Sequence, residues 1–124
     1  MELRTKAEWL YIMIDKKDND CALIKTGLSR DTLYNRFHHY KTGNPWLVCL
    51  AVCEVRKRQN LAKVEKLFHA FCEENFPFIC GEWYLVEGKE EIKKIEEMGF
   101  DYFGKLTYRI KGKEIVNKKV CELW

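Results

Sequence analysis

The sequence predicts one small domain of the α/β or α+β class, with helices packed on a small mixed sheet. Apolar runs of strand length alternate along the chain with segments of helical periodicity. Hydrophobic residues make up 47% of the composition and aromatic residues 14%, as expected for a packed globular protein. A chain of 124 residues can close one such core without disulfides or metal. We therefore expect a single domain over residues 1–124.

The first pair of strands gives the clearest signal. Two apolar runs, 9–14 and 21–27, are separated by six residues that favour turns. Because side chains alternate across a strand, Tyr11 and Met13 should share one face of this hairpin, opposite the leucine and isoleucines of the same run. The hairpin therefore places the Tyr11 hydroxyl on a sheet face beside Lys25, one strand over.

A helix and a third strand are expected next. The apolar spacing predicts a helix over about 31–39, with Ser29 or Asp31 as its N-cap, and a Gly-Asn-Pro stretch ends it. Residues 46–55 are almost all apolar, which predicts a strand buried on both faces.

The second half of the chain begins with an amphipathic helix. Apolar residues recur at intervals of three and four over 61–73, and Glu65 and His69 lie one turn apart on that helix. The remaining expected elements are an aromatic-rich loop over 75–81, a strand over 82–86, a helix over 89–98, and a terminal hairpin within 100–124 that turns at 111–113.

Charge and cysteine usage restrict the function classes only weakly. The formal net charge is +3, from 22 basic and 19 acidic residues, which does not by itself call for nucleic acid. No run approaches the ~20 apolar residues of a membrane helix, and the N-terminus lacks a signal-peptide core. We expect no membrane partner and a reducing intracellular compartment, the cytoplasm or nucleus, with the cysteines as free thiols. A zinc site built on Cys49, Cys53 and a histidine is the alternative.

Several short motifs occur in an order that is more specific than any one of them. They are Tyr11 on the first strand, Lys25-Thr26-Gly27 at the end of the second, Arg36 on the first helix, Thr42-Gly43-Asn44-Pro45 after it, Glu65-Lys66-Leu67-Phe68-His69 on the second helix, and Gly81-Glu82-Trp83 before a strand. This order resembles the GIY-YIG nuclease superfamily, and most of all its divergent branch in phages, large viruses and some eukaryotes. The match covers about 9–86 and leaves 87–124 as an extension.

The resemblance implies a fold and an activity. The fold is a mainly antiparallel central sheet of three strands flanked by helices. The activity is that of a metal-dependent endonuclease, which hydrolyses phosphodiester bonds in DNA with Mg²⁺ or Mn²⁺ as cofactor. A virus- or phage-encoded protein that uses a protein partner for targeting fits the same resemblance.

The resemblance also implies roles for individual residues. Tyr11 helps to activate the attacking water, and Lys25 favours its phenolate. Arg36 stabilises the pentavalent phosphorane, and Glu65 holds the divalent cation. Tyr40 falls at a family position one helical turn after the arginine. His69 completes the expected catalytic set, and the expected contacts to the DNA backbone are Arg56, Lys57, Arg58 and His39.

Departures from the family pattern keep a second hypothesis open. Lys25 stands where the second motif usually has a tyrosine, and Trp9 stands where the first has a glycine. No asparagine follows Glu65 at the family's late position, where Glu82 is a candidate substitute. The alternative to an active nuclease is therefore a catalytically impaired module that binds DNA or a protein.

Each candidate also has a plainer interpretation when it is considered alone. Tyr11 would be a packing residue on a half-buried strand. Arg36 and Glu65 would be ordinary charges on helix surfaces, and Glu65 with His69 would be a simple i,i+4 contact.

Overall fold

The computed structural model describes residues 8–16, 18, 20–29, 32–44, 47–55, 61–109 and 114–116. Its elements are β1 (Glu8–Lys16), β2 (Cys21–Ser29), α1 (Leu33–Gly43), β3 (Val48–Val55), α2 (Leu61–Asn75), β4 (Phe78–Cys80), β5 (Trp83–Glu87), α3 (Lys89–Met98), the 3₁₀ helix η1 (Gly99–Arg109) and β6 (Glu114–Val116). Within these residues, no helix is long and apolar enough to cross a membrane.

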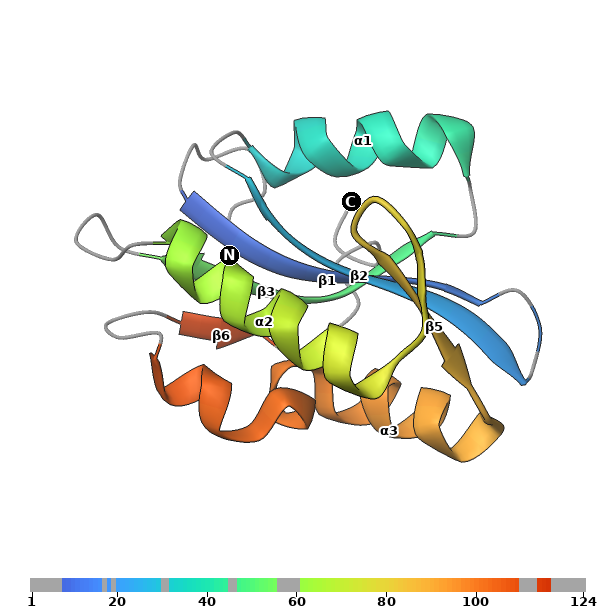
Figure 1. Cartoon of the computed structure of the whole chain (residues 1–124). Coiled ribbons are helices and arrows are strands. Elements are labelled where there is room, and N and C mark those ends of the chain that lie inside the picture. Colours follow the sequence, from blue (N-terminus) through green and yellow to red (C-terminus); the bar gives the residue numbers. More distant parts are fainter. Residues whose placement is uncertain are drawn as a thin grey trace.

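The strands form one sheet in the order β4-β5-β2-β1-β3-β6, and every neighbouring pair is antiparallel (Figure 1). The α+β class is confirmed, but the prediction of three strands is wrong, because the sheet has six. The expected strands β2, β1 and β3 form its middle. At one edge the sheet is extended by β5 and by β4, which a turn at Gly81 folds back onto β5. At the other edge it is extended by β6, which pairs with β3. The segment 75–81 therefore contains a short strand and is not all loop.

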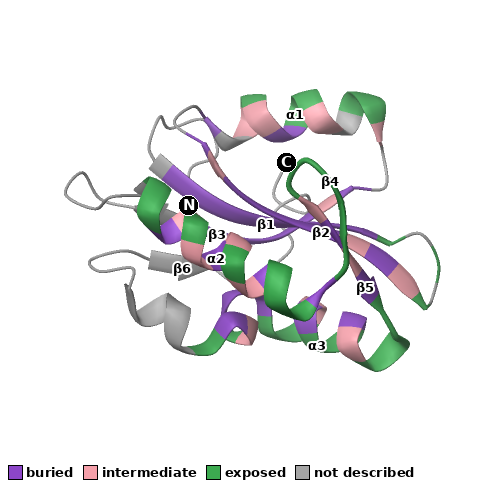
Figure 2. Ribbon diagram, in the orientation of Figure 1, coloured by how far each residue is buried: buried purple, intermediate pink, exposed green. Residues whose placement is uncertain are grey.

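Helices cover both faces of the sheet, as Figure 1 shows. Helix α1 lies on one face, while α2, α3 and η1 lie on the other. The predicted alternation in β1 is confirmed: Tyr11 and Met13 pack with Phe37 of α1. The leucine and isoleucines of β1 pack with Phe68 of α2 and Ile95 of α3. Figure 2 shows the result, a buried β1 between helices whose outer surfaces are exposed.

A bulge in β3 separates two of the cysteines. The register between β1 and β3 shifts after the pair Ile12 and Ala51, so the alternation of side chains along β3 is broken. Cys49 consequently packs on the α1 side of the sheet and Cys53 on the α2 side. The zinc alternative is wrong for this pair, because the sheet itself lies between the two thiols. The cysteines whose side chains are described are free thiols, and Cys49, Cys53 and Cys72 are buried as expected.

Helix α1 starts later and ends later than its sequence indicates. Its N-cap is Thr32, whose hydroxyl accepts a hydrogen bond from the Asn35 backbone N–H at 3.1 Å. The expected cap at Ser29 is wrong, because Ser29 ends β2; the other expected cap lies outside the described residues. At the other end the Asn44 N–H donates to the Tyr40 carbonyl, so α1 continues to Gly43 and Tyr40 lies within the helix.

The chain after α3 differs most from its prediction. Residues 99–109 form the 3₁₀ segment η1, which consists of two short helices separated by a kink at Gly104. The prediction of a hairpin strand over this part is therefore wrong. The reason is aromatic spacing: Phe100 and Phe103, three residues apart, both pack on Phe68 of α2. The turn predicted at 111–113 lies outside the described residues.

Candidate functional site

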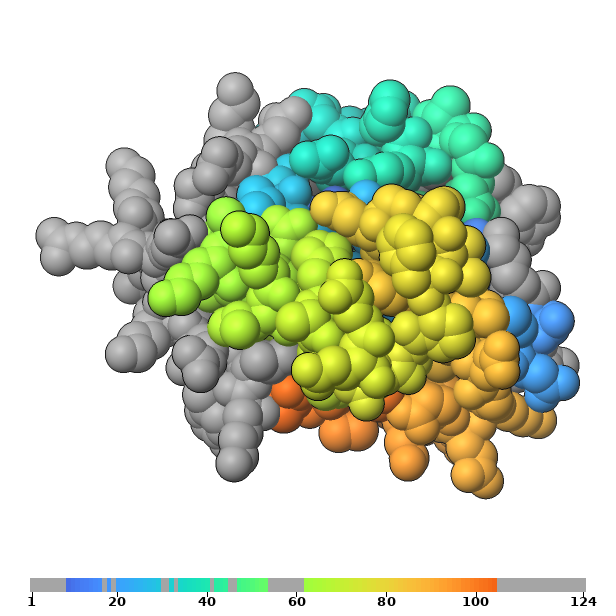
Figure 3. All heavy atoms as spheres, viewed as in Figure 1, coloured from blue at the N-terminus to red at the C-terminus, as the bar shows by residue number. Residues whose placement is uncertain are grey.

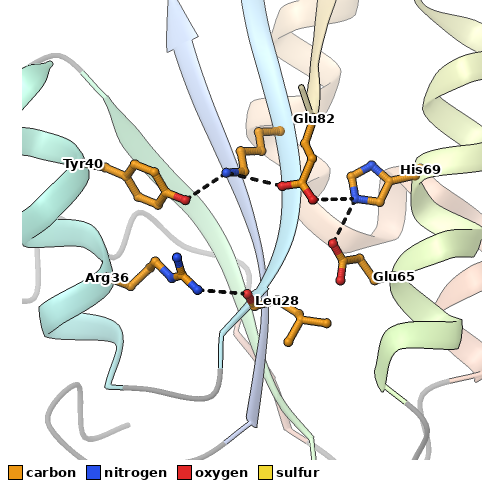
Figure 4. Close-up of polar contacts among 7 residues, drawn as sticks. Leu28, Arg36, Tyr40, Glu65, His69 and Glu82 are labelled. Atoms are coloured by element: carbon orange, nitrogen blue, oxygen red, sulfur yellow. Dashed lines mark hydrogen bonds and ion pairs between the residues drawn. The ribbon is translucent and has the colours of Figure 1, made fainter. Parts of the chain in front are cut away.

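The candidate site lies where the pairing of β2 with β5 stops. Lys25 and Trp83 form the last pair of this ladder, so in the described sheet β2 continues past Lys25 without a neighbour on that side. Glu82 immediately precedes Trp83 and sits at this point. Figure 4 shows Glu82 between side chains of α1 on one side and of α2 on the other. In the space-filling view, the segment around β4 lies between those two helices (Figure 3).

Five side chains form a continuous line of polar contacts across this point, and we call them the polar chain. They are Tyr40, Lys25, Glu82, His69 and Glu65. The Lys25 Nζ donates to the Tyr40 hydroxyl at 2.9 Å and lies 3.4 Å from Glu82 Oε2. His69 Nε2 lies 3.8 Å from Glu82 Oε1 and 3.0 Å from Glu65 Oε1 (Figure 4). The polar chain therefore links α1 to α2 beside the start of β5.

Lys25 is the buried member of the polar chain, with 8% of its surface exposed. A charged ammonium is expensive to bury unless polar partners replace its water. Here the partners are the Tyr40 hydroxyl and the Glu82 carboxylate, and the Tyr40 ring lies 4.7 Å from Nζ in a cation–π contact. Lys25, which stands where the second motif of the superfamily usually has a tyrosine, is thus held by both polar and aromatic contacts.

The pKa values of the two tyrosines of the site are shifted in opposite directions. Tyr11 is buried, and burial together with the hydrogen bond to Tyr40 raises the pKa of Tyr11. Burial also acts to raise the pKa of Tyr40, but hydrogen bonds from Lys25 and Tyr11 and the positive charges of Lys25 and Arg36 outweigh it. The pKa of Tyr40 is lowered as a result. The phenol that ionises more readily is therefore Tyr40, with Tyr11 as its hydrogen-bond donor.

Gly27 is required by the position of Tyr11. A Cβ atom on Gly27 would lie 2.6 Å from the Tyr11 hydroxyl oxygen and 2.7 Å from its Cζ. A side chain does not fit there without movement, because the ring of Tyr11 lies over Gly27, its direct partner in the β1–β2 ladder. The glycine of the Lys25-Thr26-Gly27 motif therefore makes room for the tyrosine hydroxyl.

Arg36 lies beside the polar chain on α1, one turn before Tyr40. Its Nη2 is 3.5 Å from the Leu28 carbonyl oxygen, and its guanidinium carbon is 6.0 Å from the centre of the Tyr40 ring. Within the described part of the chain, no carboxylate forms an ion pair with Arg36. Its charge is partly exposed and can face an anion.

The structure brings most of the expected site residues together. Tyr11, Lys25, Arg36 and Tyr40 lie on the α1 side, and Glu65 and His69 lie on the α2 side. Exposed His39 adjoins Tyr40, with ring centres 6.2 Å apart. The basic residues 56–58 lie outside the described residues. Glu82 joins the two sides, although the expected catalytic and metal-binding sets omitted it. The sequence feature that could have indicated it is the Gly-Glu-Trp motif, in which Gly81 has φ +55°.

Three of these side chains can hold a metal ion. Potential ligand atoms of Glu65, His69 and Glu82 all lie within 4.8 Å of one another, and the described residues contain no other such group. Two carboxylates and an imidazole form a donor set that fits a divalent cation. The expected metal ligand, Glu65, is one of the three.

Comparison with known proteins decides the family. A model of the T5orf172 domain matches residues 8–98, from β1 to the end of α3. The chain belongs to the T5orf172 domain family. This is a phage-derived family within the GIY-YIG nuclease-like superfamily, so the expected superfamily is confirmed. The match includes every residue of the polar chain and indicates a nuclease-like or DNA-binding function.

The other two comparisons add no relatives. No curated protein and no solved structure matches the chain significantly. The assignment to a particular branch of the superfamily stays a prediction.

Substitution of Gly27 tests the packing of the tyrosine. We expect Gly27→Ala to destabilise the fold by about 1–3 kcal/mol, because the new methyl group meets the Tyr11 ring and hydroxyl. Chemical denaturation measures the change. Gly43→Ala is the matched control, because a Cβ on Gly43 meets no atom within 4 Å. Equal stability of the two variants would contradict the packing.

Proposed function

We propose that this T5orf172 protein is a metal-dependent endonuclease that hydrolyses phosphodiester bonds in DNA. The observation that supports this most strongly is the polar chain with Arg36 beside it. It brings together a phenol whose pKa is lowered, a partly exposed arginine and a set of potential metal ligands. Phosphodiester hydrolysis needs a base for water, positive charge for the phosphorane and a Lewis acid.

Arg36 provides fixed positive charge for the reacting phosphate. The forked N–H donors of a guanidinium match the oxygens of a phosphate, which they can bind in pairs. The proposed role is to bind two of these oxygens as negative charge grows in the transition state. The exposed neighbour His39 and the basic residues 56–58 would hold the flanking DNA backbone, without reading its sequence.

Tyr40 accepts the proton of the attacking water in this proposal. The resemblance suggested Tyr11 for this step, but burial removes Tyr11 from water and raises its pKa. Tyr40 is only partly buried, and Lys25 stabilises its phenolate through a direct hydrogen bond. Tyr11 then acts through Tyr40, as the donor that further stabilises the phenolate.

Glu65, with His69 one turn later, provides the cation-binding side of the site. The donor set fits Mg²⁺ or Mn²⁺ in charge and chemistry. A bound cation would supply positive charge to the phosphate and to the leaving oxygen. Because Lys25 contacts both Tyr40 and Glu82, the proposed base and the proposed metal ligands lie on either side of the Lys25 ammonium.

Plasmid nicking tests the proposed activity. We expect the protein to convert supercoiled plasmid to the nicked form when Mg²⁺ or Mn²⁺ is added. Glu65→Gln should lower the rate by about a hundredfold or more, since it removes the carboxylate charge that holds the cation. Glu74→Gln, an exposed glutamate on the same helix, is the matched control and should nick at the wild-type rate.

The nicking assay also separates the two functional hypotheses. Salt-sensitive DNA binding without any metal-dependent nicking would identify a catalytically impaired binding module. The feature that favours this alternative is Lys25, which occupies the place of a family tyrosine. If the protein bound neither DNA nor metal, a protein-binding module would be the remaining hypothesis.

The pH dependence of nicking distinguishes the two tyrosines. If Tyr40 must be ionised, the rate rises with pH until the pKa of Tyr40, which lies below the ordinary value of about 10. We expect Tyr40→Phe to lower the rate by about a hundredfold or more and to abolish this rise. Tyr11→Phe removes only a donor to Tyr40, so the rise should move to higher pH with its plateau retained. Loss of activity in Tyr11→Phe alone, with Tyr40→Phe active, would assign the base to Tyr11.

A further inference from the structure

We infer that Glu65, His69 and Glu82 form one three-ligand cation site, and that this site prefers Mn²⁺ and related transition metals to Mg²⁺. The inference rests on the proposed nuclease function and deepens it, because the family resemblance implied only Glu65 as a ligand of the cation. It adds two ligands and a metal preference. Binding can be measured without DNA, so this inference and the nuclease proposal can fail separately.

The distances between the donor atoms suit a single ion. Atoms bound to one cation through bonds of about 2.1 Å lie roughly 3 to 4 Å apart. His69 Nε2 lies 3.0 Å from Glu65 Oε1 and 3.8 Å from Glu82 Oε1. The three ligand atoms stay within 4.8 Å of one another, so only small side-chain movements are needed to enclose an ion. Figure 4 shows the Glu65 and Glu82 carboxylates on either side of the same imidazole nitrogen.

The backbone presents the three ligands from ordered elements. Glu65 and His69 are four residues apart on α2, a spacing that directs two ligands toward one point. Glu82 is fixed between the Gly81 turn and the Trp83–Lys25 pair of the β2–β5 ladder. Little conformational freedom is therefore lost when an ion binds.

Lys25 orients the third ligand. Its ammonium lies 3.4 Å from Glu82 Oε2, which leaves Oε1 on the side of His69. It also offsets part of the negative charge of the two carboxylates. Without a metal, a protonated His69 can hold the same carboxylates together as an ion-pair network. That metal-free network is the competing interpretation, and the experiments below distinguish the two.

The imidazole sets the metal preference. Mg²⁺ prefers oxygen ligands, keeps several waters and gains little from a nitrogen donor. Imidazole nitrogen is a favourable ligand for first-row transition metals. The affinities of sites with nitrogen and oxygen ligands rise from Mn²⁺ to Cu²⁺ and fall again at Zn²⁺. A site of one imidazole and two carboxylates should therefore select Mn²⁺ over Mg²⁺, and it should lose that preference when the imidazole is removed.

Calorimetric titration of the DNA-free protein tests the preference. We expect Mn²⁺ to bind more tightly than Mg²⁺ at one site. His69→Ala should weaken Mn²⁺ by about tenfold or more, the loss found even for outer-shell partners of metals, and leave Mg²⁺ binding nearly unchanged. Glu82→Gln should weaken both ions. His38→Ala, a change of an exposed histidine on α1, should alter neither. Equal binding of the two ions, or wild-type Mn²⁺ affinity in His69→Ala, would overturn the inference.

A second measurement uses the wild-type protein and needs no variant to fold. The chain has three histidines, so the imidazole NMR signals can be followed individually during titration with Zn²⁺. We expect the signals of one histidine, His69, to shift in proportion to the bound metal. Shifts of all three, or of none, would favour the metal-free ion-pair network. Selective Mn²⁺ binding without any nicking would support the site and reject the nuclease. Nicking at limiting Mn²⁺ that is unaffected by His69→Ala would do the reverse.

Discussion

The site depends on one buried ammonium. Lys25 leaves the sheet on the face covered by α1, where its Nζ contacts the Tyr40 hydroxyl, and the same atom reaches Glu82 at the start of β5. Burying this charge is tolerable only because both partners are present. Loss of either partner would leave an uncompensated charge, so the hydrogen bond and the ion pair stabilise one another. Tyr40, Lys25 and Glu82 are therefore best regarded as a single unit.

The sheet topology explains why residues from both layers can meet. A complete β2–β5 ladder would separate the α1 side of the sheet from the α2 side. The ladder ends at Lys25 and Trp83, and the Gly81 turn brings Glu82 to the gap. Glu82 can then contact Lys25 on one side and His69 on the other. The end of the β2–β5 ladder is thus the place where the proposed base and the proposed metal ligands meet.

Much of the framework could be predicted from local patterns. The β1–β2 hairpin, the faces of β1 and the bounds of α3 follow from apolar periodicity, because each pattern is long enough to repeat. Strand β4 could not be predicted, because it has only three residues and depends on a neighbour for its pairing. A strand after the predicted turn at 111–113 is present as β6, but no local pattern indicates that it pairs with β3. The bulge in β3 could not be predicted either. A bulge shows in a sequence as a break in the alternation of apolar and polar residues, and this run is apolar almost throughout.

The candidate site was predictable in its members but not in their chemistry. The order of motifs indicated Tyr11, Arg36 and Glu65 as candidates. The pKa of a side chain, however, depends on its burial and on neighbouring charges, which the sequence alone does not give. Tyr11 is on the expected face but is enclosed there, and the phenol beside Lys25 is Tyr40. Glu82 was visible only as part of a motif, because its contacts join segments that are distant in sequence.

The central claim is that the Lys25 ammonium makes this polar chain a catalytic unit, and Lys25→Met tests it most directly. Methionine keeps a long apolar stem in the buried position and removes the ammonium with its charge and hydrogen-bond donors, so the fold should stay intact. Nicking of supercoiled plasmid with Mn²⁺ should fall by about a hundredfold or more, while the melting temperature stays near the wild-type value. A folded Lys25→Met protein that nicks at the wild-type rate would contradict the claim.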